Sequence, residues 1–94
     1  MSKIFKVVQQ GQAFAVQSKS APNGQTMKCG IILREIGGEY ENTYMCTLWG
    51  NDASVVYQSG DLVVAALRFS THEYQGPQGT QVFQDISVKE IRKI

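Results

Sequence analysis

An all-β fold, built as a small barrel of five short strands, is what this 94-residue sequence predicts. β-Branched and aromatic residues recur in short runs that Gly, Asn and Pro close, a composition typical of strands and turns. A helical period of apolar residues is almost absent. The gaps between the runs are too short for crossover helices, so neighbouring strands are expected to be antiparallel.

Size and charge limit the function classes. The length fits a single domain over residues 1–94, and 43% hydrophobic with 18% charged residues is the composition of a globular chain. The net charge of +1 means that any attraction to nucleic acid must be local to one face. The sequence has no run of about 18 apolar residues and no secretory segment at its start, so we expect no membrane association and a cytoplasmic location.

The first half of the chain contains three predicted strands. The first, Lys3 to Ser18, is long, and Gly11 is expected to break it at a bulge or bend. A turn over 21–24 (Ala-Pro-Asn-Gly) leads into the second strand, Thr26 to Ile36. Gly37-Gly38 is expected to form a tight hairpin turn into the third, Tyr40 to Trp49. The free edge of the first strand, over Lys3 to Val8, is expected to promote self-association.

The tight turn fixes a register for this hairpin. It pairs Cys29 with Cys46 and Ile31 with Tyr44 on a core face, and leaves Lys28 and Trp49 on the other face. A disulfide between the two cysteines is then geometrically conceivable, and buried reduced thiols are the alternative. A longer loop would change this register. Two distant cysteines, with only His72 to assist them, are too few for a zinc site.

The second half predicts a helical turn and two more strands. The turn spans Asn51 to Gln58, with Asn51 or Asp52 as its N-cap. The fourth strand is Leu62 to Tyr74, residues 75–81 form a polar loop, and the fifth strand is Val82 to Arg92.

Alternation along these two strands separates a core face from an outward face. The expected core residues are Val63, Ala65, Leu67 and Phe69 in the fourth strand and Val82, Gln84, Ile86 and Val88 in the fifth. The expected outward residues are Arg68, Ser70, His72, Tyr74 and Phe83. Five strands around one short helical turn predict the OB-fold, a five-stranded Greek-key barrel.

An ordered set of motifs then resembles the bacterial single-stranded DNA-binding proteins, including the small primosomal OB-fold relatives. The set comprises Pro22-Asn23-Gly24-Gln25, Leu48-Trp49-Gly50-Asn51, Ser59-Gly60-Asp61, Arg68-Phe69, Tyr74, Gly79 and Phe83. The resemblance implies that Trp49 and Tyr74 stack on bases and that Arg68 lies on the binding face. In three features the chain departs from the family: Thr43 where a stacking aromatic is expected, Leu67 where Gly is typical, and no acidic C-terminal tail for partner recruitment.

Further candidates for nucleic-acid contact come from their place on the predicted outward face or in loops. They are Lys28, Arg34, Phe83, Tyr40, Lys19 and His72. The alternatives are a surface ion pair with Glu41 for Arg34 and a barrel cap for Phe83. Tyr57 and Phe14 are expected in the core, and the run Lys89, Arg92 and Lys93 is expected at solvated strand edges.

The predicted function is binding of single-stranded DNA with low sequence specificity, by stacking and phosphate contacts, in replication, repair or recombination. RNA stays open as the ligand, and the chain is expected to form a homodimer or homotetramer. His72 has no nucleophile or carboxylate at a catalytic spacing, so we expect no enzyme activity, cofactor or metal. The alternative is an OB-fold adaptor that binds proteins, or a primosomal component with weak DNA binding.

Overall fold

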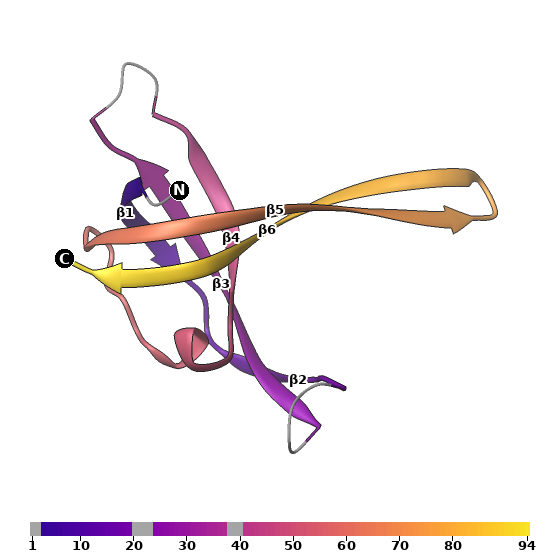
Figure 1. Cartoon of the computed structure of the whole chain (residues 1–94), viewed down its shortest axis with the longest axis horizontal. Coiled ribbons are helices and arrows are strands. Elements are labelled where there is room, and N and C mark those ends of the chain that lie inside the picture. The colour runs from indigo at the N-terminus through magenta and orange to yellow at the C-terminus, as the bar shows by residue number, and fades with distance from the viewer. Residues whose placement is uncertain (1–2, 20–23, 38–40) are drawn as a thin grey trace.

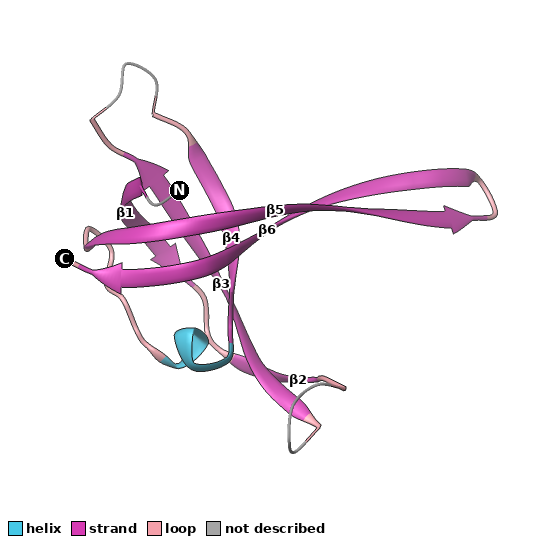
Figure 2. Cartoon of the chain, viewed as in Figure 1, coloured by secondary structure: helices cyan, strands magenta, loops and turns pink. Residues whose placement is uncertain are grey.

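The computed structural model describes residues 3–19, 24–37 and 41–94, and these residues are mostly β-strand (Figure 2). The elements are β1 (Lys3–Gln10), β2 (Phe14–Gln17), β3 (Gln25–Glu35), β4 (Thr43–Trp49), the 3-10 helix η1 (Gly50–Ser54), β5 (Leu62–Gly76) and β6 (Gly79–Lys93). The all-β prediction is confirmed. The predicted turn at Pro22-Asn23 and the residue Gly38 lie outside the described residues. No helix in the described part of the chain is long and apolar enough to cross a membrane.

Five strands close the predicted barrel. β1 pairs antiparallel with both β3 and β5, β5 pairs with β6, and β3 pairs with β4. The circle closes where β4 lies parallel to β6 at the pair Thr47 and Ser87. Phe5 and Lys6 of β1 pair with β3 on one side and with β5 on the other. The prediction that the first strand has a free edge is therefore wrong.

The predicted break at Gly11 is confirmed, and it turns one long strand into two. β1 ends at Gln10, and the Gly11 amide donates a hydrogen bond of 2.8 Å to the carbonyl oxygen of Gly30. β2 then resumes as a sixth, short strand outside the barrel and places Phe14 opposite Lys28 of β3.

The hairpin of β3 and β4 differs from its predicted register. Cys29 pairs with Leu48, and Ile31 pairs with Cys46. The connection is longer than a Gly37-Gly38 turn, since the Glu35 amide donates to the Asn42 carbonyl oxygen at 2.9 Å. A shift of two residues keeps every side chain on its predicted face, because the side-chain period of a strand is two. Both cysteines are buried free thiols.

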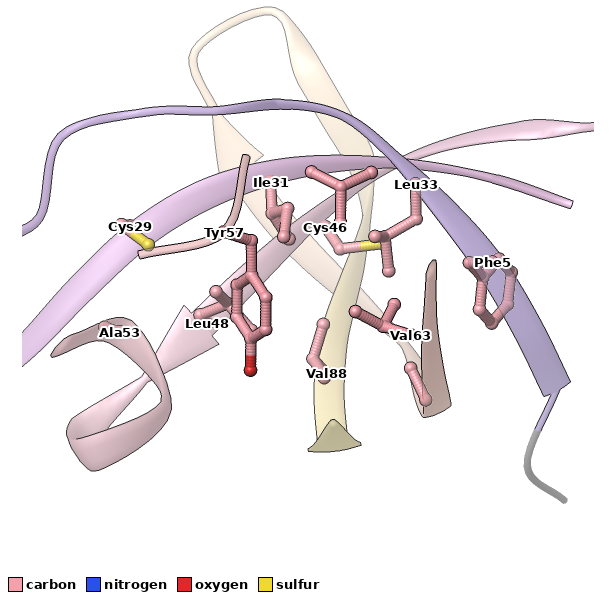
Figure 3. Packing of buried hydrophobic residues seen from close by; sticks show 12 residues of the cluster. Phe5, Cys29, Ile31, Leu33, Cys46, Leu48, Ala53, Tyr57, Val63 and Val88 are labelled. Carbon is pink, nitrogen blue, oxygen red and sulfur yellow. The ribbon is translucent and has the colours of Figure 1, made fainter. Parts of the chain in front are cut away.

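The barrel interior is apolar and tightly packed (Figure 3). Ile31 and Leu33 of β3, Leu48 of β4 and Val63 of β5 are at most 1% exposed. Tyr57 belongs to this core, as predicted, and its ring lies beside Leu48. Burial also raises the pKa of the Cys46 thiol to about 11.

The helical turn is shorter than predicted, and a side chain of β1 fixes the segment that follows it. η1 begins directly after Trp49, which occupies the N-cap position without a side-chain hydrogen bond, so the predicted caps Asn51 and Asp52 are wrong. The Gln10 amide group instead donates to the Val55 carbonyl oxygen at 2.8 Å and accepts from the Tyr57 amide at 2.6 Å. These two bonds fix the extended segment that follows η1.

Beyond the barrel, β5 and β6 continue as a two-stranded ribbon (Figure 1), and we call residues 69–86 the arm. The prediction of a polar loop over 75–81 is wrong, because β5 runs to Gly76 and β6 begins at Gly79. The φ of 114° at Gly79 permits the tight turn between the two strands. The predicted burial of Phe69, Val82 and Gln84 is also wrong. These side chains are largely open to solvent: Phe69 is 53% and Val82 62% exposed, and Gln84 is exposed as well.

Candidate nucleic-acid interface

An open groove runs between the end of β4 and the barrel end of the arm. It has a volume of about 450 Å³ and is lined by Trp49, Arg68, Ser70, His72, Ser87, Val88 and Lys89, which we call the outer groove. Strand alternation places Arg68, Ser70 and His72 on one face of β5, and Ser87 lies directly opposite Arg68. Three residues predicted from sequence, Trp49, Arg68 and His72, therefore line one surface.

Trp49 ends β4 and is 42% exposed. Gly50 has a φ of 64°, which lets the chain leave the strand at once and enter η1. Lys28 lies directly opposite on β3, and its Nζ is 5.1 Å from the centroid of the Trp49 ring, a cation–π contact. The pair supplies a stacking surface and a positive charge at the same place.

The outer groove has a local excess of positive charge. Among the described residues, Arg68 and Lys89 have no carboxylate within ion-pair distance. His72 has one, since its Nε2 lies 3.2 Å from Oδ2 of Asp85 on β6. The sequence did not predict Asp85 as the partner of His72, because the two residues are brought together by the register between β5 and β6. No group of three His, Cys, Asp or Glu side chains in the described ranges is placed to hold a metal ion.

Two predicted aromatics extend this surface along the arm. Phe83 lies opposite His72, on the same face as Arg68, and is 52% exposed. Tyr74 lies farther out on that face and is 64% exposed. The alternative of Phe83 as a barrel cap is wrong, because the residue belongs to the arm.

Of three other predicted residues, two lie away from the outer groove and one lies outside the described residues. Arg34 lies near the end of β3, six residues beyond Lys28. Its Nε forms an ion pair of 3.1 Å with Glu41, which is the alternative role that the sequence predicted for it. Lys19 follows β2 and lines a separate open pocket with Gly24. Tyr40 lies outside the described residues.

Two exposed residues on this side of the sheet, Lys89 and Phe14, were not among the predicted contacts. Lys89 was expected at a solvated edge, yet it lines the outer groove, and its shared parity with Phe83 and Ser87 was the available signal. Phe14 was expected in the core, yet it is 53% exposed. Its strand is separated from β1 by the break at Gly11, so alternation along the first run did not reveal its face.

Thr43 stands where the resemblance implied a stacking aromatic, and the adjacent ring of Tyr44 does not take that place. Tyr44 points inward, packs edge-on against Phe5 at 6.2 Å, and donates a hydrogen bond of 2.8 Å to Oε1 of Glu35. That bond to a carboxylate raises the pKa of Tyr44. The outer face is occupied here by Met45, which is 78% exposed.

Comparisons with known proteins support the fold. No protein-family model matches the chain, and no curated protein sequence matches it. Among solved structures the chain is similar to the second OB-fold domain of replication protein A from Methanococcus maripaludis, with 22% identity and a TM-score of 0.64. The match covers 99% of this chain and 81% of that one. Membership of the bacterial single-stranded DNA-binding family stays a prediction. What the structure and this comparison show is that the chain has the OB-fold.

Proposed function

We propose that the chain binds single-stranded DNA with little sequence preference, through the outer groove and the face of the arm that carries Tyr74 and Phe83. The observation that carries this proposal is the placement of Trp49, Arg68 and Lys89 around one open groove. Exposed rings stack on any base, and cations in a groove follow the phosphate backbone. The name of the similar domain, from a replication protein, supports a role in DNA replication, and repair and recombination use the same ligand. Single-stranded RNA also has bases that stack and a phosphate backbone, and it is the alternative ligand.

The charge of the surface predicts a shallow salt dependence. Lys28, Arg68 and Lys89 are the cations at or beside the outer groove. Three phosphate contacts on a single strand give a slope of roughly −2 for log K against log salt. Affinity therefore depends mainly on stacking.

The sole tryptophan tests the proposal directly. A titration with oligo-dT of about 30 nucleotides at low salt should quench the fluorescence of Trp49, because a stacked base contacts its ring. The same titration with an RNA oligonucleotide compares the two strands. Fluorescence that stays unchanged, together with no retardation of labelled oligonucleotide on a native gel, would contradict the proposal.

A second candidate function, an adaptor that binds a protein, is favoured by an apolar groove on the barrel wall. This groove has a volume of about 240 Å³ and lies over Gly30, with Ile32 and the exposed Met45 at its side. An apolar side chain of a partner fits such a surface better than a phosphate does. Met45→Asp should leave oligonucleotide affinity within about twofold if DNA is the ligand of the outer groove, and should abolish partner binding if the adaptor function holds.

We also propose self-association as a homodimer or homotetramer, and binding without catalysis or a cofactor. With β1 paired on both sides, the longest open edges that favour self-association belong to the arm, where the described residues show no third strand beside β5 or β6, and β2 adds a short one. Light scattering during size-exclusion chromatography measures the mass. A mass of about 10 kDa at all concentrations would contradict the oligomer.

A further inference from the structure

Three side chains form a row across the outer face of β2, β3 and β4. Phe14 pairs with Lys28, and Lys28 pairs with Trp49. Residues directly opposite each other in antiparallel strands project from the same face of the sheet. The row therefore places one cation between two aromatic rings.

Both rings are accessible, and their spacing keeps them apart. Phe14 is 53% and Trp49 42% exposed. Their strands are separated by β3, which sets the two backbones roughly 10 Å apart. Among the described residues no ring pairs with Phe14 or with Trp49, so each retains a free aromatic surface.

Lys28 restricts one of these surfaces in the free protein. Its ammonium lies 5.1 Å from the Trp49 ring centroid, a distance at which the charge is attracted to the ring face. A base that stacks on this face must displace the ammonium. The displaced charge stays beside the stacked nucleotide, where a phosphate is its natural partner.

We propose that Phe14 is a second base-stacking residue and that Lys28 exchanges the ring of Trp49 for a DNA phosphate when a base binds. This inference rests on the proposed function and adds to it a residue on β2, outside the outer groove. It also assigns to Lys28 two partners in sequence, the indole in the free protein and the phosphate in the complex.

Phe14 and Lys28 should give different signatures in oligo-dT titrations at several salt concentrations. Phe14→Ala and Phe14→Leu should each lower affinity by roughly 5- to 150-fold with an unchanged salt slope, while Phe14→Tyr should bind as the wild type does, because the aromatic ring and not its apolar area is required. Lys28→Gln should lower the magnitude of the salt slope by about 0.7. It should also change the Trp49 emission of the free protein but not that of the saturated complex.

Phe69→Ala is the matched control, because Phe69 is also 53% exposed but lies on the opposite face of β5 from Arg68. It should bind as the wild type does, and thermal melts check that each variant is folded. If Phe14→Ala or Phe14→Leu binds as tightly as the wild type, the stacking role of Phe14 is overturned while the proposed function stands. An unchanged salt slope in Lys28→Gln overturns the exchange. Wild-type protein that binds no oligo-dT overturns both the inference and the proposed function.

Discussion

The barrel and the arm are built from the same two strands, yet their side chains meet opposite environments. In the barrel part of β5, Val63 and Ala65 alternate inward and are at most 1% exposed. In the arm, Phe69 continues the same alternation and is 53% exposed. The difference is coverage, because β1 pairs with β5 only between Leu62 and Ala65. Alternation along a strand therefore predicts a face, and the neighbouring strands decide whether that face is buried.

This difference separates stability from binding. Barrel residues contribute to folding through burial, which favours the folded state by roughly 25 cal/mol per Å² of apolar surface. A two-stranded ribbon is only marginally stable by itself, so the arm depends on the barrel for its shape. Its exposed aromatics on the Arg68 face, Tyr74 and Phe83, are free to contribute to ligand binding instead.

The largest expected effect is on folding. Leu33→Ala should lower the free energy of unfolding by about 2–5 kcal/mol, because Leu33 is fully buried and its loss leaves a cavity. Phe83→Ala on the arm should cost less than about 1 kcal/mol. Denaturant titrations of both variants measure the two values. Equal losses would mean that the arm is part of the core, and the comparison would fail.

A pH effect should also belong to the barrel. Burial raises the pKa of Cys46 from 9.0 to about 11, so the folded state holds the thiol proton more tightly than the unfolded state does. The free energy of unfolding should therefore fall by about 1.4 kcal/mol per pH unit as the pH rises between these values. Cys46→Ala should lack this part of the pH dependence. Identical slopes in the two proteins would show that the thiol titrates in the folded state as it does in the unfolded one.

Arm aromatics should affect binding without affecting folding. Tyr74→Ala and Phe83→Ala should each weaken oligo-dT binding by about 1–3 kcal/mol if each ring stacks on a base. Val82→Ala lies on the other face of the arm and serves as the control, with unchanged affinity. Fluorescence anisotropy with labelled oligonucleotide gives the affinities. Equal losses in all three variants would point to a general disturbance of the arm.

The smallest effect is expected at a single charge. Arg68→Ala should reduce the magnitude of the salt slope by about 0.7, the contribution of one phosphate contact on a single strand. Arg92→Ala, an exposed arginine outside the outer groove, should leave the slope unchanged. Titrations at four or more salt concentrations resolve the difference. A slope that changes only in Arg92→Ala would move the phosphate path away from the outer groove.

Local patterns were sufficient to predict most of the fold. Turn residues and alternation predicted the five barrel strands, the break at Gly11 and the core face of β3 and β4, because these features depend on neighbouring residues in the chain. The register of β3 and β4 was wrong, since the loop length that sets it is not encoded in a Gly-Gly pair. The arm was missed because the composition of residues 75–81 is the same for a polar loop and for strands that project from the barrel.

The candidate site was predictable where parity alone decided it. Trp49, Arg68 and His72 were assigned to one face and line one groove. The ion pair of His72 with Asp85 and the position of Phe14 opposite Lys28 depend on the register between strands, which the sequence does not reveal. These cross-strand neighbours determine the charge balance of the groove and the row of Phe14, Lys28 and Trp49.

Backbone amide shifts in solution, recorded by NMR with and without oligo-dT, test the central claim most directly. We predict that the perturbed amides cluster at Lys28, Trp49, Arg68, Ser70 and Lys89 and continue along the arm. The buried barrel positions Val7, Leu33 and Val63 should remain unshifted. Shifts centred on the apolar groove at Met45, or no shifts at saturating oligonucleotide, would contradict the claim that the outer groove binds single-stranded DNA.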